Sequence, residues 1–134
     1  MNSLMKSMTV SISIDRDPKT VYEFIYNLTN LPKWAKMLCL SIKQQSKNGE
    51  WIIKTPQGDA KIRLTRKNKF NILYHYVSSA PGVEVFVPMR VVPNYRYGSE
   101  VMLTVFQTAD MSQDKFTEDI GLVNQDLRRM RRAS

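Results

Sequence analysis

The residues of this sequence best suited to ligand chemistry are Arg90, His75, Tyr74 and Tyr76. Arg90 follows a run of valines, and its planar guanidinium could give two parallel hydrogen bonds to a carboxylate, a phosphate or an enolate. The tyrosine hydroxyls could contact a ligand, and His75, the one histidine, could act as a general base. Each has a structural alternative: Arg90 could pair with Glu100 across a hairpin, and the tyrosines could simply pack on a sheet.

Strand register decides which of these side chains share a face, because a slip of one residue moves every side chain to the other face. Pro88 lies inside a predicted strand, 83–92, and has no amide hydrogen, so it marks a bulge or an unpaired position. With a bulge there, His75 is expected to point outward. The expected inner face holds Val83 and Arg90, together with Tyr74 opposite Val87 and Tyr76 opposite Val85. Without the bulge, His75 would join Arg90 inside as the best general-base candidate.

Cysteine usage limits the chemistry further. Cys39 is the one cysteine, so no internal disulfide can form, and we expect it to be a small buried side chain. One cysteine and one histidine do not make a metal site of the usual soft ligands. The sequence therefore predicts neither a metal nor a cofactor.

The length of 134 residues predicts one domain, residues 1–134, with a core of its own. The hydrophobic share of 43% and the charged share of 24% are ordinary for a globular protein. No segment approaches the roughly 20 apolar residues of a membrane span. The first residues, from Met1 to Met8, lack the features of a secretory signal, so we expect the cytoplasm.

Twenty Lys and Arg residues against twelve Asp and Glu give a net charge of +8. This excess could indicate nucleic acid or an anionic surface as partner, but Lys61, Arg63 and Lys67 fall where a strand would face solvent. The arginines of 128–132 complement the end of a helix, with weak attraction for anions as the alternative. Cations and aromatic residues do not alternate along the chain as stacking platforms require, so a nucleic-acid partner is disfavoured.

Asp17-Pro18 separates an alternating strand from a helix with apolar residues at i, i+3, i+4 and i+7. Asp17 can cap the helix, and Pro18 loses no hydrogen bond at its first position. A short further turn of helix is predicted in 33–38. Strands are predicted at 9–14, 40–45, 50–55, 60–66, 72–78, 83–92 and 100–108, separated by Gly, Pro and Asn turns.

A final helix is predicted over about 112–131, with Ser112 as its cap. Its apolar stripe consists of Phe116, Ile120, Val123, Leu127 and Met130 and should face the sheet. Inside this helix, Gly121 lowers helix stability by roughly 1 kcal/mol relative to Ala. Its presence suggests that the helix closely approaches another backbone or a ligand there, and neutral drift to Gly is the alternative. The order of elements predicts a curved antiparallel sheet of seven strands around this helix.

Several short segments carry a family resemblance: Leu31-Pro32-Lys33-Trp34, Gly49-Glu50-Trp51, Thr55-Pro56-Gln57-Gly58, Val87-Pro88-Met89-Arg90-Val91-Val92-Pro93-Asn94, Gly98-Ser99-Glu100-Val101 and Asp126-Leu127. Because of the order and spacing of these segments, the chain resembles the SRPBCC superfamily, which includes START domains, birch-pollen-allergen-like proteins and the polyketide cyclase/dehydrase group. The resemblance implies an α+β helix-grip fold with a hydrophobic cavity between sheet and final helix. It implies ligand binding and carries over no catalytic motif. The basic end of the final helix departs from the family pattern.

We therefore expect a module that binds a small hydrophobic or amphipathic molecule, lipid-like or polyketide-like, with an anionic or polar head. Trp51 could line the cavity or fill the core. The expected ligand-binding residues are Trp51, Tyr74, Tyr76, Val85, Val87, Arg90, Phe116 and Ile120. The alternative is an enzyme of the polyketide cyclase or aromatase type, in which Arg90 or a tyrosine stabilises an enolate. Nucleic-acid or anionic-surface binding is a more distant alternative.

Overall fold

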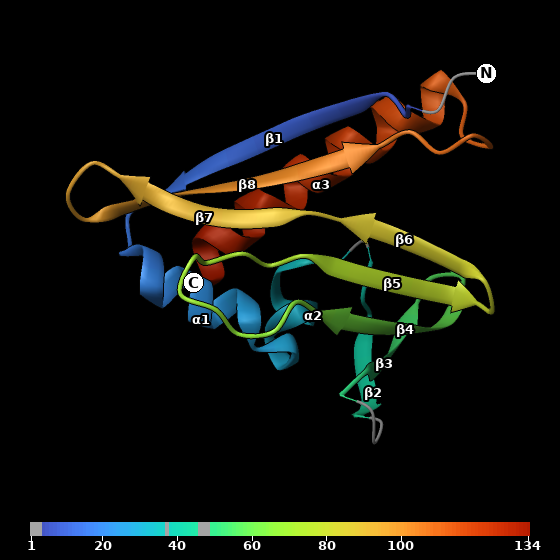
Figure 1. Ribbon diagram of the computed structural model, residues 1–134, viewed down its shortest axis with the longest axis horizontal. Helices are drawn as coiled ribbons and strands as arrows, with labels where there is room; N and C mark the ends of the chain where they lie inside the picture. The colour runs from blue at the N-terminus through green and yellow to red at the C-terminus, as the bar shows by residue number, and fades with distance from the viewer. Residues whose placement is uncertain (1–3, 37, 46–48) are drawn as a thin grey trace.

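The chain combines helices with antiparallel strands, and its computed structural model describes residues 4–36, 38–45 and 49–134 (Figure 1). The strands are β1 (Ser7–Ile14), β2 (Ser41–Gln45), β3 (Trp51–Thr55), β4 (Gly58–Leu64), β5 (His75–Ala80), β6 (Val83–Val87), β7 (Met89–Asn94) and β8 (Gly98–Phe106). The helices are α1 (Pro18–Tyr26), the 3-10 helix η1 (Leu28–Asn30), α2 (Leu31–Trp34) and α3 (Gln113–Ala133). None of these described helices is long and apolar enough to cross a membrane.

The strands form two sheets, and the expectation of one seven-stranded sheet is wrong. The first sheet has three strands in the order β1-β8-β7, and the second has five in the order β2-β3-β4-β5-β6. The predicted strand 83–92 is split at Pro88 into β6 and β7, which belong to different sheets. Pro88 accepts a hydrogen bond from Thr104 N at 3.0 Å, but it has no amide hydrogen to donate, so the ladder breaks there.

A short segment before β5 joins the two sheets. Ile72 forms an isolated antiparallel bridge with Arg90, flanked by bonds from Leu73 N to Met89 O (2.8 Å) and from Val91 N to Asn71 O (3.1 Å). Asn71 has a φ of 58°, a left-handed conformation that Asn tolerates better than most residues. The predicted strand 72–78 therefore becomes a bridge and a shorter strand.

The start of α1 confirms the predicted cap. The Asp17 carboxylate accepts hydrogen bonds from Thr20 N (3.1 Å) and Thr20 Oγ1 (2.6 Å), which hold the pKa of Asp17 below its ordinary value. Pro18 occupies the first turn, where no amide donor is lost. The helix buries Val21 and Ile25 and directs them toward the strands.

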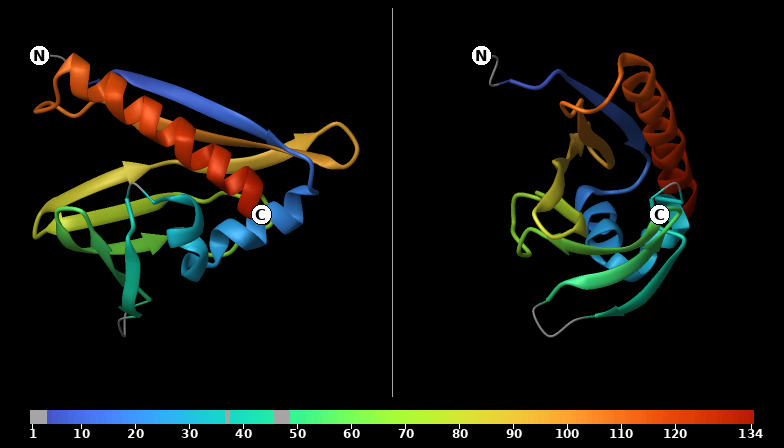
Figure 2. Two further views of the ribbon diagram at one scale, coloured as in Figure 1. Left: turned by 180° about the vertical axis from the view of Figure 1, so that it is seen from behind. Right: turned by 90° about the vertical axis from the view of Figure 1, so that its right-hand side faces the viewer.

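The last helix, α3, also begins as predicted, with Ser112 Oγ accepting from Lys115 N at 3.1 Å. It packs chiefly on β1, β8 and α2, and Figure 2 shows it along β1 and β8 with its C-terminal end beside α2. Phe116, Leu127 and Met130 are buried. Gly121 is exposed, and a Cβ there would meet no atom within 4 Å, so no close backbone approach explains this glycine.

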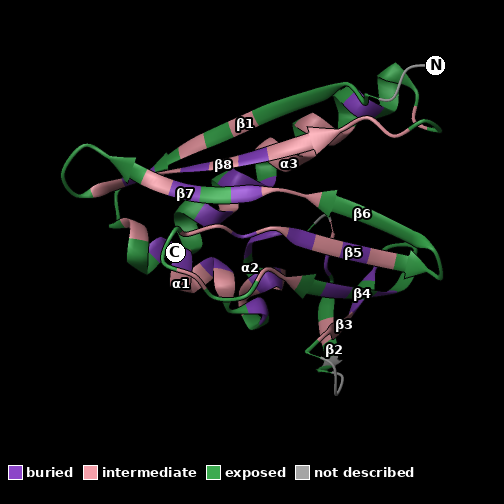
Figure 3. Ribbon diagram, in the orientation of Figure 1, coloured by how far each residue is buried: buried purple, intermediate pink, exposed green. Residues whose placement is uncertain are grey.

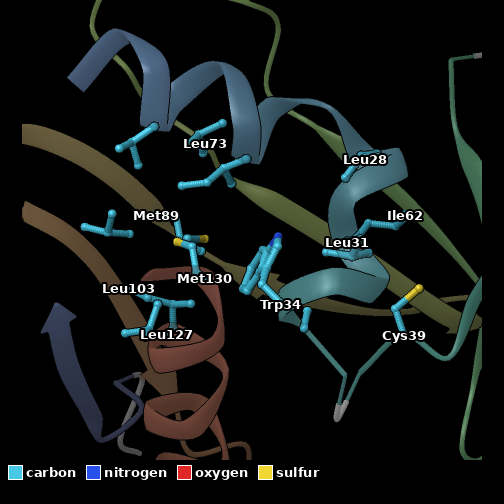
Figure 4. Packing of buried hydrophobic residues seen from close by; sticks show 14 of the residues in the cluster. Leu28, Leu31, Trp34, Cys39, Ile62, Leu73, Met89, Leu103, Leu127 and Met130 are labelled. Carbon is cyan, nitrogen blue, oxygen red and sulfur yellow. The ribbon is translucent and has the colours of Figure 1, made fainter. Parts of the chain in front are cut away.

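The core lies where α1, α2 and the end of α3 meet both sheets. Trp34 lies at its centre, with Met89 and Met130 on one side and Leu31 on the other (Figure 4). Most residues of β6 are exposed to solvent, in contrast to those of the core (Figure 3). The edge of the five-stranded sheet formed by β6 is therefore open to solvent.

Candidate functional site

The inner face of the five-stranded sheet is a wall of apolar side chains. Strand pairing places Trp51, Ile62, Val77 and Val85 in one row, because each is the partner of the next on the neighbouring strand. The next row consists of Leu64, His75 and Val87. Ile62 and Val77 are buried, whereas Val85 is 45% exposed. Of the expected site residues, Trp51, Val85 and Val87 therefore share one surface.

The expected positions of Tyr74 and Tyr76 are wrong by one residue of register. Tyr76 pairs with Phe86, and it is His75 that pairs with Val87. The β5–β6 hairpin closes through a two-residue turn, Pro81-Gly82, between Ala80 and Val83, and a bulge precedes it between Ser78 and Ala80. Together, the shorter turn and the bulge reverse which residues beside Val85 and Val87 point inward, so the tyrosines lie on the outer face and His75 lies on the inner one.

Aromatic rings gather on that outer face. Phe86 stacks on Tyr76 with ring centroids 5.2 Å apart and meets the edge of Tyr74 at 5.4 Å. Phe106 stacks on the other side of Phe86 at 6.3 Å, and Arg63 Cζ lies 4.0 Å from the Tyr76 centroid. Aromatic and cationic side chains thus meet in space although they do not alternate in the sequence. The contacts of these rings with one another occupy part of the ring surface that stacking with bases would need.

Arg90 is exposed on the outer face, so its expected inner position is wrong. It lies opposite Met102, and within the described chain it forms no ion pair with Asp or Glu. The expected partner, Glu100, instead accepts hydrogen bonds from Ser13 Oγ (2.6 Å) and Asn94 Nδ2 (3.0 Å). The Ser13 bond is the main reason that the pKa of Glu100 lies below its ordinary value.

His75 is buried on the inner face, with 4% of its surface exposed. Its Nδ1 lies 2.9 Å from Leu73 O, and because a carbonyl oxygen only accepts, Nδ1 carries the proton. Burial lowers the pKa of His75 to about 4, so the ring is neutral near pH 7 and Nε2 holds a lone pair. Nε2 is buried without a hydrogen-bond partner among the described residues.

Trp34 meets His75 edge to face, with ring centroids 6.4 Å apart and planes at 77°. Its indole Nε1 is also buried without a partner in the described chain. Buried polar groups are almost always hydrogen-bonded, so two such atoms in one ring contact need an explanation. Trp34 thus has an unpaired donor and His75 an unpaired acceptor, and a hydroxyl group or a water molecule can pair with an atom of either kind.

The remaining expected residues lie elsewhere or play structural roles. Phe116 is buried in the first half of α3 with Lys6 Nζ 5.9 Å from its ring centroid, and Ile120 is half-buried one turn further on. Cys39 is buried as expected, and burial raises the pKa of its thiol to about 11, which disfavours the nucleophilic thiolate. Trp34 was not foreseen as a site residue, although an indole N–H in an apolar segment is a donor that needs a partner.

No family model matches the sequence, and no curated protein matches it significantly. The fold is similar to that of protein XoxI from Bacillus cereus, with a TM-score of 0.76 and 20% identity, covering 96% of this chain and 95% of that one. An uncharacterized protein from Bacillus thuringiensis gives a TM-score of 0.74 at 20% identity, covering 96% and 98%. DynU16, a protein in the dynemicin biosynthetic locus, gives 0.68 at 11%, covering 94% of this chain and 46% of that one. These likenesses establish a shared fold.

Proposed function

We propose that the protein binds a small, mainly apolar molecule with a neutral hydroxyl group against the inner face of the five-stranded sheet. The observation that carries this proposal is the contact of His75 with Trp34, which holds an unpaired buried acceptor and an unpaired buried donor. A hydroxyl can donate to His75 Nε2 and accept from Trp34 Nε1. Such polar anchors in an apolar surround are typical of small-molecule sites.

The charges favour a neutral polar group over the anionic head expected from Arg90. Arg90 lies on the opposite face, and His75 is neutral at ordinary pH. An anion buried beside a neutral imidazole would lose its hydration without a compensating charge, which is costly. A neutral hydroxyl carries a far smaller desolvation cost.

The apolar part of the ligand would lie on Trp51, Val85 and Val87. Val83 and Val85 are 49% and 45% exposed, so apolar surface extends from solvent toward His75, the strand partner of Val87. Met89 and Met130, buried around Trp34, are unbranched and flexible and can shift to admit a ligand. These features support binding without requiring a rigid empty cavity.

We also propose that the chain is an SRPBCC protein of helix-grip type. The sequence segments described above support this. Catalysis of the cyclase type is the weaker alternative, because a base works best with a pKa near the operating pH and that of His75 is about 4.

Tryptophan fluorescence tests the proposal directly, because both tryptophans, Trp34 and Trp51, belong to the candidate site. Octanol, octyl methyl ether and octyl sulfate share a tail and differ in the polar end. We expect octanol to bind most tightly. Replacing His75→Phe should remove the preference for octanol over the ether, a loss of about three- to tenfold for one hydrogen bond.

Tyr76→Phe is the matched control, since it removes a hydroxyl from the outer face of the same strand. It should leave all three affinities unchanged. Tightest binding of octyl sulfate, or an unchanged octanol preference in His75→Phe, would overturn the neutral-hydroxyl site. Native mass spectrometry of protein from its own host should show a copurified neutral molecule, and no spectral response to any probe together with no such molecule would overturn binding altogether.

A further inference from the structure

Two open, shallow hollows lie at the C-terminal end of α3, one lined by cations of α3 and of residues 33–36 and the other by cations of α3 alone. The first, of about 250 Å³, is lined by Lys33, Lys36, Arg129, Arg132 and Ala133. The second, of about 270 Å³, is lined by Gln125, Arg128, Arg129 and Arg132. Arg129 and Arg132 contribute to both, so the two hollows adjoin one another.

In the lining of these hollows, as far as the structure describes it, cations outnumber acidic residues. Arg129 Nη1 lies 2.7 Å from Asp126 Oδ1, and both side chains are largely buried, so this arginine is held in place. The described lining of the two hollows contains five cations, Lys33, Lys36, Arg128, Arg129 and Arg132, and no Asp or Glu. Like charges around one hollow repel one another, and a bound anion would offset that repulsion because it attracts each cation.

The helix dipole explains only part of this arrangement. Arg131 and Arg132 lie in the last turn of α3, where cations complement the partial negative charge of the helix end. Lys33 and Lys36 come from α2 and the residues after it, about a hundred positions earlier in the chain, and yet line the same hollow as Arg132. The stability of α3 does not require Lys33 and Lys36 to lie beside Arg132.

We propose that these two hollows together bind a diphosphate group, which Arg129 and Arg132 contact because they line both hollows. The planar guanidinium gives two parallel hydrogen bonds to phosphate oxygens, and lysines add compact positive charge. The ion pair with Asp126 fixes Arg129 before the anion arrives, which lowers the entropy cost of binding. This site is independent of the proposed hydroxyl-ligand site.

Isothermal titration with inorganic pyrophosphate and inorganic phosphate at low ionic strength tests the proposal. Pyrophosphate should bind more tightly than phosphate. Arg132→Gln removes a cation common to both hollows and should weaken pyrophosphate about tenfold or more, as expected for a hydrogen bond to a charged group. Lys36→Gln and Arg128→Gln each affect a single hollow and should each reduce the advantage of pyrophosphate over phosphate.

Arg131→Gln is the matched control, because it makes the same charge change in the same helical turn but lines neither hollow. It should retain pyrophosphate affinity within about twofold, the scale of a screened surface charge. An equal loss in Arg131→Gln and Arg132→Gln would overturn the site in favour of diffuse attraction. Equal affinity for phosphate and pyrophosphate would overturn the two-hollow arrangement. Binding of a single-stranded oligonucleotide or of phosphatidylserine vesicles without pyrophosphate binding would assign the cations to a polyanionic partner and overturn the diphosphate.

Discussion

Phe86 of β6 stacks on Phe106 of β8 across the line where Pro88 separates the two sheets, with ring centroids 6.3 Å apart. Their planes differ by 18°, and Tyr76 stacks on the far side of Phe86. Backbone hydrogen bonding is interrupted at Pro88, so this side-chain contact connects the sheets where the ladder does not. The outer aromatic residues therefore have a structural role.

A double-mutant cycle of Phe86→Leu and Phe106→Leu should show this connection. Aromatic pairs contribute about 0.5 to 1.5 kcal/mol beyond their buried area, so the coupling in the free energy of unfolding should fall in that range. Urea denaturation measures it. Phe70, which is 63% exposed, gives the control cycle with Phe106, and its substitutions should add independently. Additive effects for Phe86 and Phe106 would mean that this aromatic contact does not help to join the sheets.

The break between the sheets could be foreseen in part, because Pro88 lacks an amide hydrogen whatever its surroundings. What the sequence does not show is that the two halves of the predicted strand 83–92 belong to different sheets. That division depends on which strands β6 and β7 pair with, β5 and β8 respectively. Those partners are chosen by packing rather than by local propensity.

The residues expected at the candidate site depended on the strand register, and the predicted register differs from that of the structure by one residue. A four-residue connection, 79–82, was predicted, but the hairpin has a two-residue turn and a bulge between Ser78 and Ala80. Residues that suit a turn do not reveal a bulge beside it, and the difference exchanged His75 with its tyrosine neighbours. The contact between Trp34 and His75 joins residues far apart in the sequence, so only the folded chain brings it about.

Phe116→Asp and Ile120→Asp should differ in severity, although both lie on the apolar stripe of α3. Phe116 is 1% exposed, and an unpaired carboxylate in its place should cost more than about 4 kcal/mol, as buried charges do. Ile120 is half-buried, so its variant should cost about 1 to 3 kcal/mol. Chemical denaturation compares the two. Equal midpoints for both variants and the unaltered protein would show that this stripe faces solvent.

Gly121→Ala should stabilise the protein by about 0.5 to 1 kcal/mol, the usual advantage of Ala over Gly inside a helix. The position is exposed, and the added Cβ would meet no atom within 4 Å. Thermal unfolding should therefore show a higher midpoint. A lower midpoint would indicate that the glycine serves a contact formed outside the folded monomer.

The stability of the protein should depend on the protonation of His75 between its two pKa values. The pKa is about 4 in the folded chain and near the ordinary 6.5 when unfolded, so below about pH 6.5 the unfolded state binds more protons. Stability from this group is fully present above that pH, falls as the pH drops toward 4, and is then constant. The shift corresponds to about 3 kcal/mol, at 1.36 kcal/mol per pKa unit. His75→Phe cannot titrate, so urea unfolding from about pH 7 to pH 4 should show a steeper loss for the unaltered protein. Parallel pH profiles for the two proteins would mean that His75 takes up a proton without unfolding, as it would if Nε2 could reach water.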